Sequence, residues 1–181
     1  MNRRMASALV VLGLAMVSSR EAAATVLLPA DFAQMVTESH LIVHARVIEV
    51  QGVLVGARRS IETVVTAAVL SPLKGATGGE LVFRIPGGRV GRYRRIFVGA
   101  PVFTPGDEVV LFLKGRAPAV AMPFGLSQGV YRVSRATGAP MVLPVPPTAD
   151  VAAAPRGDPM RRPLALDEFA RQVRQTLAAV R

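Results

Sequence analysis

Cysteine does not occur in this 181-residue chain, and lysine and histidine occur only twice each. The absence of cysteine excludes a disulfide scaffold, thiolate metal sites, thiol nucleophiles and a lipoprotein anchor, which requires an acylated cysteine. Stability must therefore come from an ordinary apolar core, for which 51% hydrophobic residues are sufficient. The sequence also lacks a strong catalytic or cofactor-binding pattern, so we expect a non-enzymatic protein without a cofactor.

The chain has no apolar run as long as the roughly 20 residues that span a membrane. Its N-terminal run, Met5–Val17, has 13 residues, follows Arg3 and Arg4, and precedes a short polar stretch ending in Ala22–Ala24. This layout is typical of a secretory signal peptide. We therefore expect residues 1–24 to direct export to the periplasm or the cell exterior. Cleavage is the expected fate of this segment, and retention as an N-terminal anchor is the alternative.

Acidic residues are scarce, because 12 Asp and Glu stand against 22 Lys and Arg, for a formal charge of +10. Removal of residues 1–24 takes away three positive charges and one negative charge, which leaves +8. A basic domain favours an anionic partner such as anionic lipid, acidic polysaccharide or nucleic acid. Because export argues against nucleic acid, we expect an unidentified protein or an anionic surface ligand as the partner.

Short β-branched segments separated by glycine and proline predict a mainly β domain over residues 25–145. The expected strands cover residues 41–50, 61–70, 80–85, 96–103, 108–113, 117–126, 130–135 and 141–145. The stretch Phe97–Gly115 is the apolar centre of this domain, and Glu108–Leu113 is its expected central strand. Between them, Thr104–Asp107 fits a type II turn. The second strand is expected to end before the proline- and glycine-rich residues 72–79.

Helices are expected near both ends of the domain. Residues 29–40 predict a short helix with an apolar face, and residues 164–181 predict an amphipathic helix with Asp167 as a candidate N-cap. The proline- and alanine-rich residues 146–163 between domain and helix predict an extended linker. Five to seven strands with such helices predict a small closed or partly open OB-like barrel. We expect the C-terminal helix to cover its open end, and docking on a partner or membrane is the alternative.

Five motifs occur in a characteristic order: ESHLIVHARVIEV, SIETVVTAAVLSPLKG, FRIPGG, GAPVFTPGDEVVLFL and GLSQGVYRV. In these motifs the chain resembles a group of uncharacterised exported bacterial proteins. The resemblance implies an architecture similar to the netrin/TIMP-like branch of OB-folds, and it transfers no activity. Inhibitors of that branch block a protease zinc with an N-terminal cysteine, which is absent here. Secreted protease inhibition is therefore retained only as an alternative function.

A glycine- and arginine-rich loop at residues 86–95 supplies the candidate ligand-binding residues. Arg89, Arg92, Arg94 and Arg95 surround Tyr93. Guanidinium groups beside an aromatic ring can bind anions or stack on a ring. The glycines do not form a phosphate loop, because no G-K-[ST] follows them. The sequence favours the other interpretation, a solvated hairpin whose arginines keep an exposed sheet edge from pairing.

His40 and His44 are the two histidines of the chain, and their spacing of four residues places them on one face of a helix or strand. They could hold zinc or copper if Glu38 or Glu49 joined them. No third ligand stands at a metal-motif spacing. The alternative is that His40 ends the first helix and His44 is a partly buried strand residue.

The sequence Gly125–Gly129 matches G-x-S-x-G, which would make Ser127 the nucleophile of a hydrolase. That motif requires a strand before the serine and a helix after it, whereas the residues that follow here predict a strand. Both histidines also precede the serine, contrary to the order in α/β-hydrolases. A strand–turn–strand connection is therefore favoured, and a serine hydrolase is the lower-ranked alternative.

Asp107 and Glu108 form the one adjacent pair of carboxylates in the expected β domain. Neighbours on a strand point to opposite faces, so the pair is poorly placed for acid–base catalysis. We interpret both as turn and edge residues. The function expected from the sequence is thus an exported, non-enzymatic binding or interaction module with an anionic or protein ligand.

Overall fold

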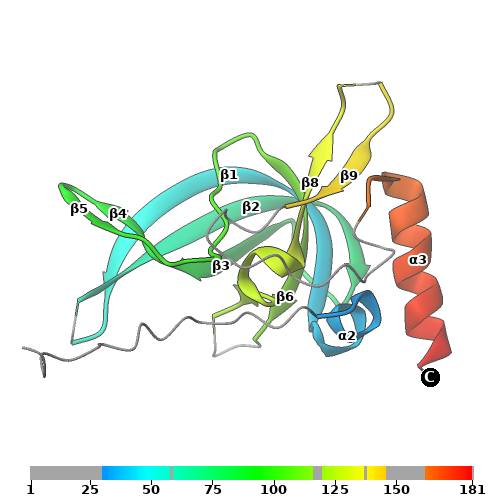
Figure 1. Ribbon diagram of the computed structural model, residues 1–181, viewed down its shortest axis with the longest axis horizontal. Helices are drawn as coiled ribbons and strands as arrows, with labels where there is room; N and C mark the ends of the chain where they lie inside the picture. The colour runs from blue at the N-terminus through cyan, green and yellow to red at the C-terminus, as the bar shows by residue number, and fades with distance from the viewer. Residues whose placement is uncertain (1–29, 58, 116–119, 137, 146–161, 181) are drawn as a thin grey trace, which may run out of the picture.

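The computed structural model describes residues 30–57, 59–115, 120–136, 138–145 and 162–180 (Figure 1). The expected signal peptide and nearly all of the expected linker lie outside these residues. No helix within the described part of the chain is both long and apolar enough to cross a membrane.

One eight-stranded antiparallel sheet forms the body of the molecule (Figure 1). Its strand order is β10-β9-β8-β6-β1-β2-β3, and β7 pairs with β6. The strands are β1 (Leu41–Val55), β2 (Ser60–Lys74), β3 (Glu80–Pro86), β6 (Glu108–Lys114), β7 (Met122–Pro123), β8 (Val130–Ser134), β9 (Met141–Pro144) and β10 (Leu164–Ala165). A separate hairpin consists of β4 (Gly88–Val90) and β5 (Tyr93–Arg95). The helices are α2 (Phe32–Glu38), α3 (Leu166–Ala179) and the short 3₁₀ helix η1 (Leu126–Gly129).

The sheet is not closed into a barrel, because β10 and β3 stand at the two ends of its strand order. One isolated parallel bridge joins Phe83 of β3 to Ala121, and the Arg84 amide donates to the Ala121 carbonyl at 2.9 Å. The expected mainly β fold with a short N-terminal and a longer C-terminal helix is therefore confirmed. Seven strands form the continuous order of the sheet and β7 is an eighth beside it, against the five to seven expected, and the sheet is not closed into the expected barrel.

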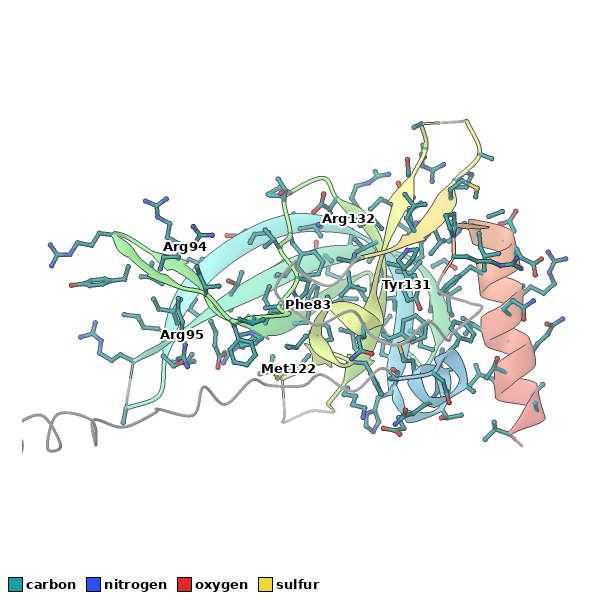
Figure 2. The ribbon with its side chains drawn as sticks, in the orientation of Figure 1. Phe83, Arg94, Arg95, Met122, Tyr131 and Arg132 are labelled. Atoms are coloured by element: carbon teal, nitrogen blue, oxygen red, sulfur yellow. The ribbon has the colours of Figure 1, made fainter. Side chains whose placement is uncertain are left out.

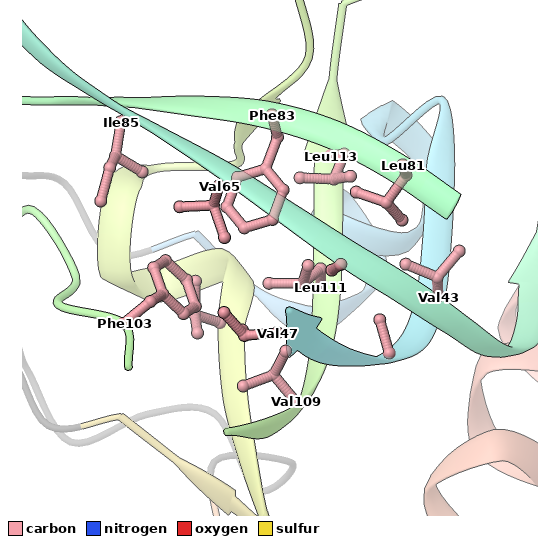
Figure 3. Packing of buried hydrophobic residues seen from close by; sticks show 13 residues of the cluster. Val43, Val47, Val65, Leu81, Phe83, Ile85, Phe103, Val109, Leu111 and Leu113 are labelled. Carbon is pink, nitrogen blue, oxygen red and sulfur yellow. The ribbon is translucent and has the colours of Figure 1, made fainter. Parts of the chain in front are cut away.

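Strand β6 is buried on both faces, which confirms Glu108–Leu113 as a central strand. Val109, Leu111 and Leu113 belong to an inner core between β1, β2, β3 and β6, where Phe83 and Phe103 pack edge to face (Figure 3). Val110 and Phe112 belong instead to an outer core under the two helices. Successive side chains of β6 thus point alternately into the two apolar clusters, as expected of a strand without a solvent-facing side.

Helix α2 forms as the sequence predicts. The Asp31 carboxylate accepts a hydrogen bond from the Gln34 amide at 2.6 Å, which satisfies one free donor of the first turn. Its expected apolar face is buried in the outer core, where Phe32 packs edge to face against Phe112 and Phe169. Because a helix of seven residues is not stable in isolation, α2 depends on the packing of this face against the sheet.

Helix α3 also packs on its own domain, with Phe169 and Val173 fully buried in the outer core. It covers the outer side of β6, β8 and β9 rather than an open barrel end, because the sheet does not form a barrel. The expected N-cap is wrong, since Ala165 occupies that position without a side-chain bond. Asp167 lies in the first turn, where a carboxylate still interacts favourably with the helix dipole.

Several of the expected strands differ from those observed. Strand β1 continues to Val55 instead of ending at residue 50. Strand β2 continues through Pro72 to Lys74. Proline is tolerated there because β3 pairs with β2 only as far as Ala68, so the rest of β2 has a neighbouring strand on one side only. Residues 96–103 form an irregular segment instead of a strand, because Gly99 has a positive φ of 82° and Pro101 lacks an amide donor. Of the strand expected over residues 117–126, the described part contains only β7.

Candidate ligand site at the arginine hairpin

Strands β4 and β5 form the arginine hairpin, residues 88–95, at the end of the molecule opposite α3 (Figure 1). Glycines allow it to lie close against the main sheet. Gly87 and Gly88 have φ values of 85° and 131°, which favour glycine, and the Thr63 hydroxyl donates to the Gly87 carbonyl at 2.8 Å. A Cβ at Gly52 would lie 1.9 Å from the Arg89 carbonyl oxygen. The hairpin position therefore depends on a missing side chain in β1.

The structure brings together all five sequence-predicted ligand residues, which are exposed on this hairpin. Figure 2 labels two of them, Arg94 and Arg95. The Arg92 guanidinium lies 5.1 Å from the centre of the Tyr93 ring and donates to its hydroxyl at 3.0 Å. Arg89 donates to the Gly91 carbonyl at 3.2 Å, and Arg95 donates to the Ser60 hydroxyl. No described carboxylate forms an ion pair with any arginine of the hairpin.

A pocket of about 500 Å³ lies between the arginine hairpin and residues 96–103. Arg89, Arg94 and Arg95 contribute the basic part of its lining. The apolar part includes Ile85, Ile96, Phe97, Val98, Val102 and Phe103. A volume of this size is within the range of small-molecule sites, which combine apolar walls with a few polar groups.

Sequence reasoning missed the segment that forms the apolar wall. It assigned residues 96–103 to a strand with a kink at Gly99 and Pro101, whereas Ile96 is 73% exposed and Val102 is 75% exposed. Only Phe103 at its end is part of the inner core. The kink expected at Gly99 and Pro101 was the correct signal, but its effect is larger than expected, because these residues interrupt the strand altogether.

A second charged cluster, the Glu108 network, consists of Glu108, His44, Arg46 and Arg135. The Glu108 carboxylate lies 2.8 Å from the His44 Nε2, 3.3 Å from Arg46 and 2.7 Å from Arg135. Arg135 donates to both carboxylate oxygens, which is the strong bidentate geometry. The hydrogen bond from Arg135, followed by those from His44 and Arg46, outweighs burial and lowers the pKa of Glu108 to about 2.

The Glu108 network corrects the interpretation of Asp107 and Glu108 as turn and edge residues. Asp107 is a turn residue, since its carboxylate accepts from the Thr104 amide at 2.7 Å. Glu108 is not an edge residue, because it begins the central strand and its side chain is only 10% exposed. A charged residue at the start of a buried strand needs partners, and this was the signal that could have indicated the network.

The structure does not bring the two histidines into a metal centre. His44 is buried in β1 and contacts Glu108, while His40 is exposed and its backbone amide donates to the Leu113 carbonyl. Glu38, one of the two carboxylates that could have joined them, pairs with Lys114 at 2.6 Å. Within the described residues there is no group of three or more His, Cys, Asp or Glu that could hold a metal ion.

Ser127 is buried in η1, and strand β8 follows directly. Gly125 and Leu126 before it have φ values of 51° and 60°, which turn the chain sharply. The helical element has only four residues, so the strand–helix context of a nucleophile elbow is not formed. The connection is the strand–turn–strand arrangement that the sequence favoured.

Comparison with known proteins found no matching family model, no matching curated protein and no matching solved structure. The resemblance to exported bacterial proteins therefore stays a prediction from the sequence.

Proposed function

We propose that this protein is an exported, non-enzymatic binding module that takes an anionic ligand at the arginine hairpin. The observation that supports this most directly is the set of four exposed guanidinium groups without a carboxylate partner in the described chain. Guanidinium groups offer planar, bidentate hydrogen bonding to carboxylate and phosphate. The adjoining pocket gives such a ligand a recessed place to bind.

A triple variant of the hairpin tests this proposal. Replacement of Arg92, Arg94 and Arg95 by Ser should abolish retention on an anionic matrix at low salt, because the cluster that attracts the matrix is lost. The matched control replaces Arg162, Arg171 and Arg174 by Ser, at and beside α3, with the same change in net charge. The control should keep most of the retention, and equal loss in both variants would show a general charge effect.

Export is the second part of the proposal. It rests on the signal-peptide layout of residues 1–24. Protein recovered from the periplasm or the medium of a Gram-negative host should begin at Thr25, which N-terminal sequencing would show. Recovery of the full-length chain in the membrane fraction would favour retention as an anchor instead.

We also propose that the sheet is an opened relative of an OB-like barrel. In support, β1, β2 and β3 form a continuous meander, β6 pairs with β1, and β7 pairs with β6. The bridge between Phe83 and Ala121 offers a short route from β3 back towards β7. Slow hydrogen exchange at the Arg84 amide would support this closure, and exchange as fast as at an exposed loop amide would contradict it.

A further inference from the structure

The pocket beside the arginine hairpin has two chemically different parts. Its basic lining comes from the hairpin, through Arg89, Arg94 and Arg95. Its apolar lining runs from the exposed Ile96 and Val102 down to Ile85 and Phe103, which are 4% and 5% exposed. The pocket therefore extends from a charged surface to the edge of the inner core.

A small inorganic anion would satisfy the arginines alone and leave the apolar wall uncovered. Exposed Ile96, Val98 and Val102 form a concentration of apolar surface that a lone soluble domain rarely leaves open. A flat membrane surface would contact the outer rim, but it would not enter a recess that leads to Phe103. A ligand with one anionic head and one alkyl chain matches both parts of the lining.

We infer that the pocket binds a single-chain anionic amphiphile, with its head at the hairpin arginines and its alkyl chain along the wall of Ile96, Val102 and Phe103. This inference rests on the proposed function and specifies the ligand class. Charge complementarity places the head, because the arginines have no carboxylate partner among the described residues. Burial of methylene groups against the wall supplies the dependence on chain length.

Calorimetric titration with butyl, octyl and dodecyl phosphate, each below its micelle-forming concentration, tests the inference. Each methylene group that enters the pocket should raise affinity about two- to fourfold, so octyl phosphate should bind at least about tenfold more tightly than butyl phosphate. Dodecyl maltoside, which has the chain but a neutral head, should bind far more weakly than dodecyl phosphate. Equal affinities for butyl and octyl phosphate would overturn the inference.

Substitutions in the apolar wall distinguish the contribution of the alkyl chain to affinity from that of the anionic head. The double variant Ile96→Ser and Val102→Ser should lower octyl phosphate affinity about tenfold, because two surfaces that the chain would cover become polar. Both side chains are largely exposed, so the fold should persist, which circular dichroism would check. The control variant Ile48→Ser and Val82→Ser removes two exposed apolar side chains outside the pocket lining and should bind as the unmodified protein does.

The outcomes separate the inference from the proposed function. Retention on the anionic matrix that depends on the hairpin, without any chain-length effect, would leave the binding module standing and remove the amphiphile. Retention that survives in the hairpin variant would remove the binding module itself. Binding to vesicles of anionic phospholipid but to none of the alkyl phosphates would also overturn the inference and favour a membrane surface as the partner.

Discussion

The arginines in and just after the central strands β1 and β8 have the same chemistry as those of the arginine hairpin but different surroundings. Arg46 and Arg135 contact Glu108, and Arg132 lies 2.6 Å from the Asp107 carboxylate. The hairpin arginines contact no described carboxylate, and their hydrogen bonds go to the Gly91 carbonyl and to neighbouring hydroxyl groups. An arginine that is neutralised within the fold contributes to the structure, whereas one without a partner is available to a ligand.

Strand order explains why one group of arginines has carboxylate partners and the other has none among the described residues. Strands β1, β6 and β8 are neighbours in the centre of the sheet, so side chains at the start of β6 can reach both of its neighbours. The hairpin is a separate two-stranded unit whose own residues include no carboxylate. Its arginine side chains therefore bond only to a backbone carbonyl and to hydroxyl groups within the described chain, in a protein with 12 acidic residues against 22 basic ones.

The largest expected effect comes from a change in the central strand β6. Leu111→Asp would bury a carboxylate in the inner core without a partner. We expect a loss of more than about 4 kcal/mol in the free energy of unfolding, measured by urea denaturation, and no cooperative transition if this exceeds the stability of the domain. A folded, soluble variant would show that the inner core has been misplaced.

The Glu108 network should matter more for stability than the whole hairpin. Glu108→Gln keeps the shape of the side chain but removes the charge that Arg135 and His44 contact, so we expect a loss of roughly 2 kcal/mol in unfolding free energy at neutral pH. Glu80→Gln is a control, because Glu80 is exposed at the start of β3. Equal effects of the two substitutions in urea denaturation would contradict a stabilising network.

The effect of Glu108→Gln on the free energy of unfolding should depend on pH, because the pKa of Glu108 is lowered in the folded state. The folded state keeps the carboxylate ionised down to about pH 2, whereas the unfolded chain takes up the proton near the ordinary value of 4.5. The stabilisation is therefore complete above about pH 4.5 and is lost as the pH falls towards 2. The difference in unfolding free energy between the unmodified protein and Glu108→Gln should shrink across this window, and a constant difference would contradict the assignment.

The smallest effect on stability is expected for the hairpin variant with Ser at positions 92, 94 and 95. These side chains are exposed and form no ion pair with a described residue, so the free energy of unfolding should change by no more than about 0.5 kcal/mol. Loss of matrix retention with unchanged urea denaturation would sharpen the distinction between the two groups of arginines. A loss of unfolding free energy as large as that expected for Glu108→Gln would show that the hairpin arginines also contribute to the structure, which contradicts this distinction.

Much of the fold could be predicted from short stretches of sequence. The Asp31 cap of α2, the alternation along β6 and the turn at Thr104–Asp107 depend on residues only a few positions apart. That turn is closed by a hydrogen bond from the Asp107 amide to the Thr104 carbonyl at 3.0 Å, with Gly106 at a φ of 94°. The protease-inhibitor and hydrolase alternatives remain predictions from the sequence.

The glycine and arginine content of residues 86–95 was enough to predict a short, polar and basic segment after β3, because glycine permits sharp turns. Which arginines are neutralised depends instead on contacts between residues far apart in the chain. Glu108 contacts residues 64, 62 and 27 positions away along the chain, and no local pattern indicates such partners. The pocket has the same origin, because docking of the hairpin over Gly52 and the departure of residues 96–103 from the sheet place distant segments together.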